Sequence, residues 1–353
     1  MSPHLSQVLA GLYELRAMGQ VDLDFRATPD DLYEGLLLAE VSGETRTRRV
    51  CFDMRDGPII DRTALAQNDV YFKRTYTRSE LCDLPADARA KVRPYGLNYA
   101  CSSRTQLRSI PFAKQLLFRK PTRSERNEGP LRSMRHLISH PVKWLGGPVI
   151  EMEASSPLQY TEFEATADSP ADRGVVFLTR LWCGAGKPAD VADRFRQLNE
   201  DRIELIATLR ARLGDCFVGG VERNHISEQL CPHYIVDQET IKTNYVALMK
   251  RHLIGVATPG LHGSIGWKFP EYLAAARCIV SQPLRREDSY GLVEGTHYLP
   301  FHTADECANA CERLLNDAAL AQAMRRSNED YYRNELKPPV MMLKRLHTAI
   351  AAG

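Results

Sequence analysis

Residues 259–273 read PGLHGSIGWKFPEYL, in which glycines and prolines give way to an apolar segment typical of a helix. The apolar run LIGVAT at 253–258 precedes this segment, and the run CIVSQ at 278–282 follows it. A buried strand, a glycine-containing turn, a helix and a second buried strand form a β-α-β unit, whose strands are parallel. Residues 253–282 therefore predict an α/β domain.

The same alternation continues on both sides of this unit. Apolar runs predict strands at 175–179, 216–220 and 297–301, and helical patterns occupy 189–214, 241–252 and 304–317. Gly214 can end the first of these helices as a C-terminal cap. Residues 174–335 are therefore expected to form one α/β domain with a parallel sheet.

The N-terminal region predicts a second α/β layer with a parallel sheet over residues 1–100. Ser2 can cap a helix, Pro3 suits its first turn, and Gly19 can end it after a stripe of leucines and valine. Short strands are expected at 21–25, 48–54, 69–76 and 91–98, with helical segments between them. After two prolines, Val340, Leu343, Leu346 and Ile350 form the apolar stripe of a last helix.

Composition excludes several classes of protein. The 353 residues, of which 44% are hydrophobic and 25% charged, are typical of a globular chain with about two domains. The net charge of +2 indicates no polyanionic partner for the chain as a whole, and no apolar run is long enough to span a bilayer. Nine cysteines without a CxxC pair predict reduced thiols and a cytoplasmic location. Cys307 and Cys311 are spaced as on one helix face but lack further ligands for a metal.

Residues 101–146 carry an unusual concentration of positive charge. Ten lysines and arginines stand against Glu125 and Glu128, which gives this segment +8 and leaves −6 for the rest of the chain. Bulky apolar residues such as Phe112, Phe118 and Trp144 lie among the charges. The segment is either a solvated connector or a surface for an anionic lipid or, less favoured, a nucleic acid. We treat 101–173 as a basic insertion and interdomain linker.

The loop at 259–273 also has the residues of an anion site. Gly263 and Gly266 would let a phosphate approach the backbone, Ser264 can donate a hydrogen bond, and Lys268 adds a positive charge. Glu271 either favours the positive end of the helix or accepts hydrogen bonds from sugar hydroxyls. Glycine before a helix is common, so the loop alone does not establish phosphate binding.

Two longer segments carry a resemblance to a known family. GSIGWKFPEYLAAARCIVSQPL at 263–284 and GTHYLPFHTADECANACERLLND at 295–317 resemble the C-terminal half of GT-B fold glycosyltransferases, especially the retaining group 1 families. VVFLTRLW at 175–182 resembles the first strand of their donor domain, and KVRPYGLN at 91–98 the strand and turn that close their acceptor domain. The resemblance implies two Rossmann-like α/β/α domains facing a central cleft, with a C-terminal helix at 336–353 that crosses back to the N-terminal domain.

The resemblance also implies roles for residues of the donor domain. Arg180 and Lys268 would neutralise the diphosphate of a UDP- or GDP-linked sugar, with no metal required. Gly263 and Ser264 would hold phosphate, and Glu271 the ribose. Gly263 stands where many group 1 enzymes have the first of two glutamates, so that pair is incomplete. The structural alternatives are a surface ion pair for Arg180 and an exposed helix start for Lys268.

The acceptor side rests on three further residues. His4 precedes the first helix, where inverting GT-B enzymes place a general-base histidine. Asp53 and Asp56 lie at the end of a strand expected to face the same cleft, where an aspartate could orient His4. The alternatives are a terminal histidine without a role and a turn-forming Asp56. The implied activity is sugar transfer from a nucleotide diphosphate sugar to a glycan, lipid-linked or other hydroxyl. A nucleotide-sugar epimerase and a non-catalytic glycan- or nucleic-acid-binding protein remain alternatives, and stereochemistry stays open.

Overall fold

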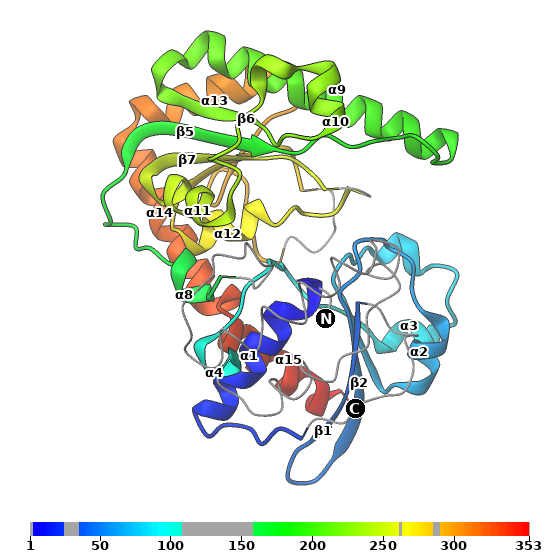
Figure 1. Cartoon of the computed structure of the whole chain (residues 1–353). Helices are drawn as coiled ribbons and strands as arrows, with labels where there is room; N and C mark the ends of the chain where they lie inside the picture. The colour runs from blue at the N-terminus through cyan, green and yellow to red at the C-terminus, as the bar shows by residue number, and fades with distance from the viewer. Residues whose placement is uncertain (1–2, 25–34, 108–157, 261–262, 285–289, 353) are drawn as a thin grey trace, which may run out of the picture.

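A computed structural model describes residues 3–24, 35–107, 158–260, 263–284 and 290–352 (Figure 1). The described residues form two α/β units, one above the other in Figure 1, each with its own sheet. The predicted α/β class is therefore confirmed.

The C-terminal unit is built on five parallel strands in the order β6-β5-β7-β8-β9. Their bounds are Asp172–Thr179 (β5), Phe217–Val221 (β6), His252–Ala257 (β7), Cys278–Ser281 (β8) and Leu299–Pro300 (β9). The last six residues of β5 and all four of β8 are buried, as expected for parallel strands covered on both faces. The strands predicted at 175–179, 216–220, 253–258, 278–282 and 297–301 are confirmed.

Helices cover both faces of this sheet (Figure 1). Leu205, Ile206 and Leu209 of α9 and Cys307 and Cys311 of α13 share one apolar cluster with β5 and β7, whereas α11 and α12 pack in the other cluster. The helix bounds are Ala189–Leu213 (α9), His225–Leu230 (α10), Lys242–Arg251 (α11), Lys268–Ala274 (α12), Ala304–Asn316 (α13) and Ala318–Tyr331 (α14). Gly214 follows α9 with φ +50°, in keeping with its predicted capping role.

The N-terminal sheet has four strands in the order β1-β2-β3-β4. They span Leu36–Ser42 (β1), Thr47–Asp53 (β2), Val70–Lys73 (β3) and Val92–Pro94 (β4). β2, β3 and β4 are parallel, but β1 pairs antiparallel with β2, so the prediction of a parallel sheet is wrong for this edge. Residues 21–24 form no strand, which corrects the strand expected at 21–25.

Two helical layers sandwich the N-terminal sheet. Phe52 and Phe72 point toward α1, Ser6–Ala17, and α15, Pro338–Ala351, whereas Cys51 and Tyr71 pack with residues of α2 and its surroundings. The smaller helices are η1 Pro3–Leu5, α2 Arg62–Gln67, η3 Arg78–Leu81, α3 Ala86–Lys91, α4 Arg104–Leu107 and α8 Tyr160–Phe163, and a π-helical turn, Tyr332–Leu336, precedes α15.

The last helix packs against α1, β1 and β2 of the N-terminal unit. A Cβ on Gly11 would lie 2.4 Å from Met342 Cγ, so the two helices touch at this glycine. The buried face of α15 consists of Pro338, Pro339, Met341, Met342 and Ala349. The predicted stripe of Val340, Leu343, Leu346 and Ile350 is partly buried, and its two leucines pack against the apolar cluster that contains α1. The helix therefore reaches the expected neighbour, but its most buried residues lie beside the predicted stripe.

The basic segment at 101–146 lies outside the described residues apart from 101–107. Its flanks lie together, because Ser102 pairs with Gln159 and exchanges backbone hydrogen bonds of 2.8 Å with Leu158 and Tyr160. All nine cysteines are free thiols. Within the described ranges, no helix has the length and apolar character needed to span a membrane.

Candidate functional site

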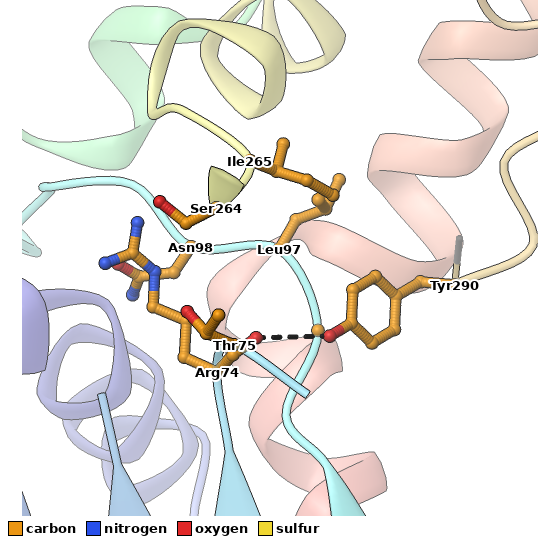
Figure 2. Close-up of a pocket in the computed structure, with 8 residues that line it drawn as sticks. Arg74, Thr75, Leu97, Asn98, Ser264, Ile265 and Tyr290 are labelled. Carbon is orange, nitrogen blue, oxygen red and sulfur yellow. Dashed lines mark hydrogen bonds between the residues drawn. The ribbon is translucent and has the colours of Figure 1, made fainter. Parts of the chain in front are cut away.

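A cleft lies where the two units meet, at the carboxyl ends of their parallel strands. Arg74 follows β3 and Gly96 follows β4, and both line a cavity whose other wall contains Ser264 and Tyr290 (Figure 2). Two contacts close the distance between the walls: the Tyr290 hydroxyl donates to the Arg74 carbonyl at 3.2 Å, and the His4 ring lies 5.0 Å from the Trp267 ring. Residues from both units therefore line the cleft, as the GT-B resemblance implies.

The loop after β7 forms one wall of this cleft. Gly263 has φ +65°, and a Cβ on Gly266 would lie 3.3 Å from the Thr258 carbonyl oxygen, so both positions favour glycine. The Gly260 N–H donates to the Ser264 carbonyl at 2.8 Å, which folds the loop back on itself. A second cavity is lined by this loop, by Ser281 at the end of β8 and by the three residues that follow it. The predicted phosphate loop therefore borders open space at the carboxyl edge of the sheet.

Lys268 and Glu271 come together with two residues of α11. The Lys268 ammonium lies 4.3 Å from the centre of the Tyr245 ring, and Glu271, only 1% exposed, accepts a hydrogen bond of 2.5 Å from Lys242. Burial lowers the pKa of Lys268 to about 8, Glu271 opposes this shift, and the nearby cations Lys242 and Arg202 add to it. Lys268 is thus a half-buried cation whose carboxylate neighbour, Glu271, is already paired with Lys242. Since α12 has only seven residues, this cation matters more for an anion than the helix dipole does.

Arg180 lies at the carboxyl end of β5 and is 52% exposed. Two of its guanidinium nitrogens donate to Glu222, which follows β6, each at 2.9 Å. This is the surface ion pair that stood as the structural alternative, and an incoming anion would have to compete with Glu222. The buried Arg202 donates to the Arg180 carbonyl at 2.6 Å and to the Pro259 carbonyl at 3.2 Å, which ties the ends of β5 and β7 together.

His4 and Asp56 meet on the opposite wall through Arg74. Arg74 donates to Nδ1 of His4 at 3.0 Å and also contacts Asp56, while Nε2 of His4 lies 3.7 Å from an Asp56 oxygen. A guanidinium can only donate, so Nδ1 must accept and neutral His4 carries its proton on Nε2. Burial and Arg74 lower the pKa of His4, against the opposing effect of Asp56. The lone pair that a general base needs is therefore occupied.

Asp53 faces a different set of partners from the one predicted. Its buried carboxylate accepts from Arg55 at 3.0 and 2.8 Å, from the Tyr71 hydroxyl and from the buried Lys73 at 3.1 Å. Burial alone would raise the pKa of Asp53, but Arg55, Lys73 and Tyr71 outweigh it and hold the pKa below its ordinary value. Asp53 thus neutralises Arg55 and the buried Lys73, and the expectation that it orients His4 is corrected.

Sequence reasoning missed four residues of this region: Arg74, Arg202, Lys242 and Trp267. Each reaches the site from a part of the chain remote from its partner, for example Lys242, which lies 29 positions before Glu271. Of these four residues, the sequence could have indicated only Trp267, which lies within the segment 259–273 already singled out. Among the described residues, no group of three or more histidines, cysteines, aspartates or glutamates is placed to hold a metal ion.

Comparison with known proteins gives weak structural likenesses alone. No family model and no curated protein matches the sequence. The C-terminal domain of LpcC, a group 1 family glycosyltransferase from Francisella tularensis, is similar over 50% of this chain and 97% of that domain, with 11% identity and a TM-score of 0.36. WaaG, a glycosyltransferase of lipopolysaccharide biosynthesis, has 12% identity and a TM-score of 0.33, and the match covers 51% of this chain and 48% of WaaG. HepE from Anabaena, in complex with UDP and glucose, is similar over 83% of this chain and 68% of its own, at 11% identity and a TM-score of 0.38.

Proposed function

We propose that this protein transfers a sugar from a nucleotide diphosphate sugar, UDP- or GDP-linked, to a hydroxyl of a glycan or lipid-linked acceptor, without a metal. The observation that carries the proposal is the half-buried Lys268 at the start of α12, directly after the loop that lines both cavities at the carboxyl ends of the strands. Ligands of open α/β sheets bind at this edge. A cation held partly out of water favours an anionic ligand that restores its charge balance.

The side chains of the donor wall match the chemistry of a leaving diphosphate. Negative charge grows on the diphosphate as the sugar departs, and fixed cations stabilise that charge most in a site with little water. Lys268 and Arg180 would supply the charge, Gly263 and Ser264 would admit and hold a phosphate, and Glu271, fixed by Lys242, would accept hydrogen bonds from the ribose. Arg180 would exchange its pair with Glu222 for the phosphate.

For the acceptor wall, we propose a positioning role for His4. Its contacts with Arg74, Asp56 and Trp267 join the two walls of the cleft. A general base, as in inverting enzymes of the plant type, needs an imidazole nitrogen that is free to accept a proton. Because Arg74 donates a hydrogen bond to Nδ1 of His4, we propose a transfer in which His4 does not act as the base. A retaining transfer does not require such a base, and the group 1 resemblance agrees with it.

A thermal-shift screen tests the proposal. Wild-type protein is heated with UDP, GDP, CDP, ADP or dTDP, and a ligand at 100 times its dissociation constant should add about 2.7 kcal/mol to the free energy of unfolding. UDP or GDP is expected to raise the melting temperature most. An unchanged melting temperature with all five nucleotides, each at millimolar concentration, would contradict the proposal.

We further propose that the basic segment at 101–146 attaches this cytoplasmic enzyme to the inner face of an anionic membrane. The proposal rests on the +8 charge and interleaved apolar residues of the sequence. Each Lys or Arg near such a surface contributes about 1 kcal/mol, and salt screens the attraction over about 8 Å. Vesicle sedimentation should increase with anionic lipid and fall with salt and when Arg119, Lys120, Arg123 and Arg126 become Ser. Equal sedimentation with neutral vesicles, or tighter binding to RNA, would overturn it.

A further inference from the structure

Two buried polar atoms on the N-terminal wall of the cleft have no hydrogen-bond partner. They are Oγ1 of Thr75 and Oδ1 of Asn98, which belong to residues only 3% and 2% exposed. Both residues line the cavity between the two units (Figure 2). Because buried polar atoms in folded proteins nearly always have a partner, two such atoms in one cavity point to a ligand that completes them.

The orientation of the Asn98 amide is fixed by its other contacts. Its nitrogen donates to the His4 carbonyl at 3.1 Å and to Oε1 of Gln7 at 3.2 Å. A carbonyl oxygen can only accept, so the amide nitrogen must face His4, and Oδ1 is left as the unpartnered atom. The missing partner of Asn98 must therefore be a hydrogen-bond donor.

The charge of the cavity selects among possible donors. Arg74 is the one charged residue among those described as lining it, and Asp56 contacts the Arg74 guanidinium. The cavity therefore has little net charge to offer a phosphate, and an ionised phosphate oxygen next to Asn98 Oδ1 would set two acceptors against each other. A neutral hydroxyl fits both orphaned atoms, because it can donate to Asn98 and either donate to or accept from Thr75.

We propose that this cavity is the subsite for the sugar hydroxyls of a substrate, with Thr75 and Asn98 as its specificity-determining residues. The inference rests on the proposed function and assigns the neutral part of the substrate to the N-terminal wall, whereas Lys268 of the C-terminal unit would take the charged part. The sugar belongs to the donor or to the acceptor, and its chemistry at this subsite is the same.

The variant Thr75→Val tests this assignment, because valine keeps the shape of threonine and removes its hydroxyl. Because the hydroxyl has no partner in the free protein, its removal should leave the melting temperature unchanged or raise it. Thr75→Ser, which keeps the hydroxyl, should bind sugars like the wild type. Thr47→Val, at the exposed start of β2, is the matched control remote from the cleft.

Calorimetric titrations measure the sugar contribution directly. Two pairs of probes, UDP with UDP-glucose and GDP with GDP-mannose, are compared in each variant, and a panel of methyl glycosides is followed by ligand-observed NMR. A donor sugar in the subsite predicts that Thr75→Val weakens the nucleotide sugar about 3- to 10-fold and leaves the nucleotide unchanged. An acceptor sugar predicts loss of methyl glycoside binding alone.

Two results would overturn the inference. One is unchanged binding of every sugar probe in Thr75→Val, and the other is a lower melting temperature, which would show that the hydroxyl is already partnered. Failure of the proposed function looks different, since wild-type protein would then bind none of the nucleotides while the glycoside titration still reports on the subsite.

Discussion

The lowered pKa of Lys268 predicts that nucleotide affinity depends on pH in a specific way. Burial brings this pKa from its ordinary 10.5 to about 8, so the ammonium is about 90% charged at pH 7 and about 10% charged at pH 9. A bound diphosphate favours the charged form, so binding above pH 8 must take up a proton. The dissociation constant of UDP or GDP should therefore rise about tenfold from pH 7 to pH 9.

Isothermal titration calorimetry of the wild type and Lys268→Arg measures this effect. Arginine keeps its charge over the whole range, so its affinity should be nearly flat with pH, and only the wild type should show proton uptake in buffers of different ionisation enthalpy. In the free wild-type protein, stability should rise with pH between about 8 and 10.5, because the unfolded chain then binds more protons than the folded one. Parallel pH profiles for the two proteins would refute the assignment of Lys268 to the diphosphate.

Three further substitutions test the site and the packing that supports it. Arg180→Ala should lower turnover about 100-fold or more with little change in melting temperature. The control Arg251→Ala breaks an exposed ion pair at the amino ends of the strands and should leave turnover intact. Equal turnover in the two variants would contradict the role of Arg180. Asp53→Ala should lower the free energy of unfolding by about 3–5 kcal/mol in urea, because the buried Lys73 loses its counter-charge, and a loss below about 1 kcal/mol would contradict this account. Gly11→Ala should cost about 1–3 kcal/mol by forcing α1 and α15 apart, and an unchanged melting temperature would argue against their close contact.

Parts of the fold were predictable because local pattern and tertiary structure agree. The run from β7 through α12 to β8 follows its sequence pattern, since buried parallel strands leave continuous apolar runs. β1 was missed because its leucines, alanine and glutamate are good helix formers, and antiparallel pairing with β2 overrides that preference. The deepest burial on α15 includes Met342 rather than the predicted stripe, because Gly11 has no Cβ and so leaves room for that side chain, which no periodicity rule foresees.

The candidate site was predictable only where one segment supplies several of its residues. Gly263, Ser264, Lys268 and Glu271 share one loop and helix, so their proximity follows from the sequence. Arg74 and its contacts with His4 depend on how the two units meet, which no local pattern encodes. Asp53 shows the same limit, since its position at a strand end suggested the cleft, but its carboxylate pairs with Arg55 and the buried Lys73.

The most direct test of nucleotide-sugar chemistry in this cleft is the release of nucleoside diphosphate from UDP-glucose and GDP-mannose. Purified wild-type protein should release UDP or GDP, slowly by hydrolysis without an acceptor and faster with one. The double variant Arg180→Ala, Lys268→Ala should lose this release while it keeps its fold by circular dichroism. Equal release by the wild type and the double variant, or no release or binding of any nucleotide sugar by the wild type, would contradict the account.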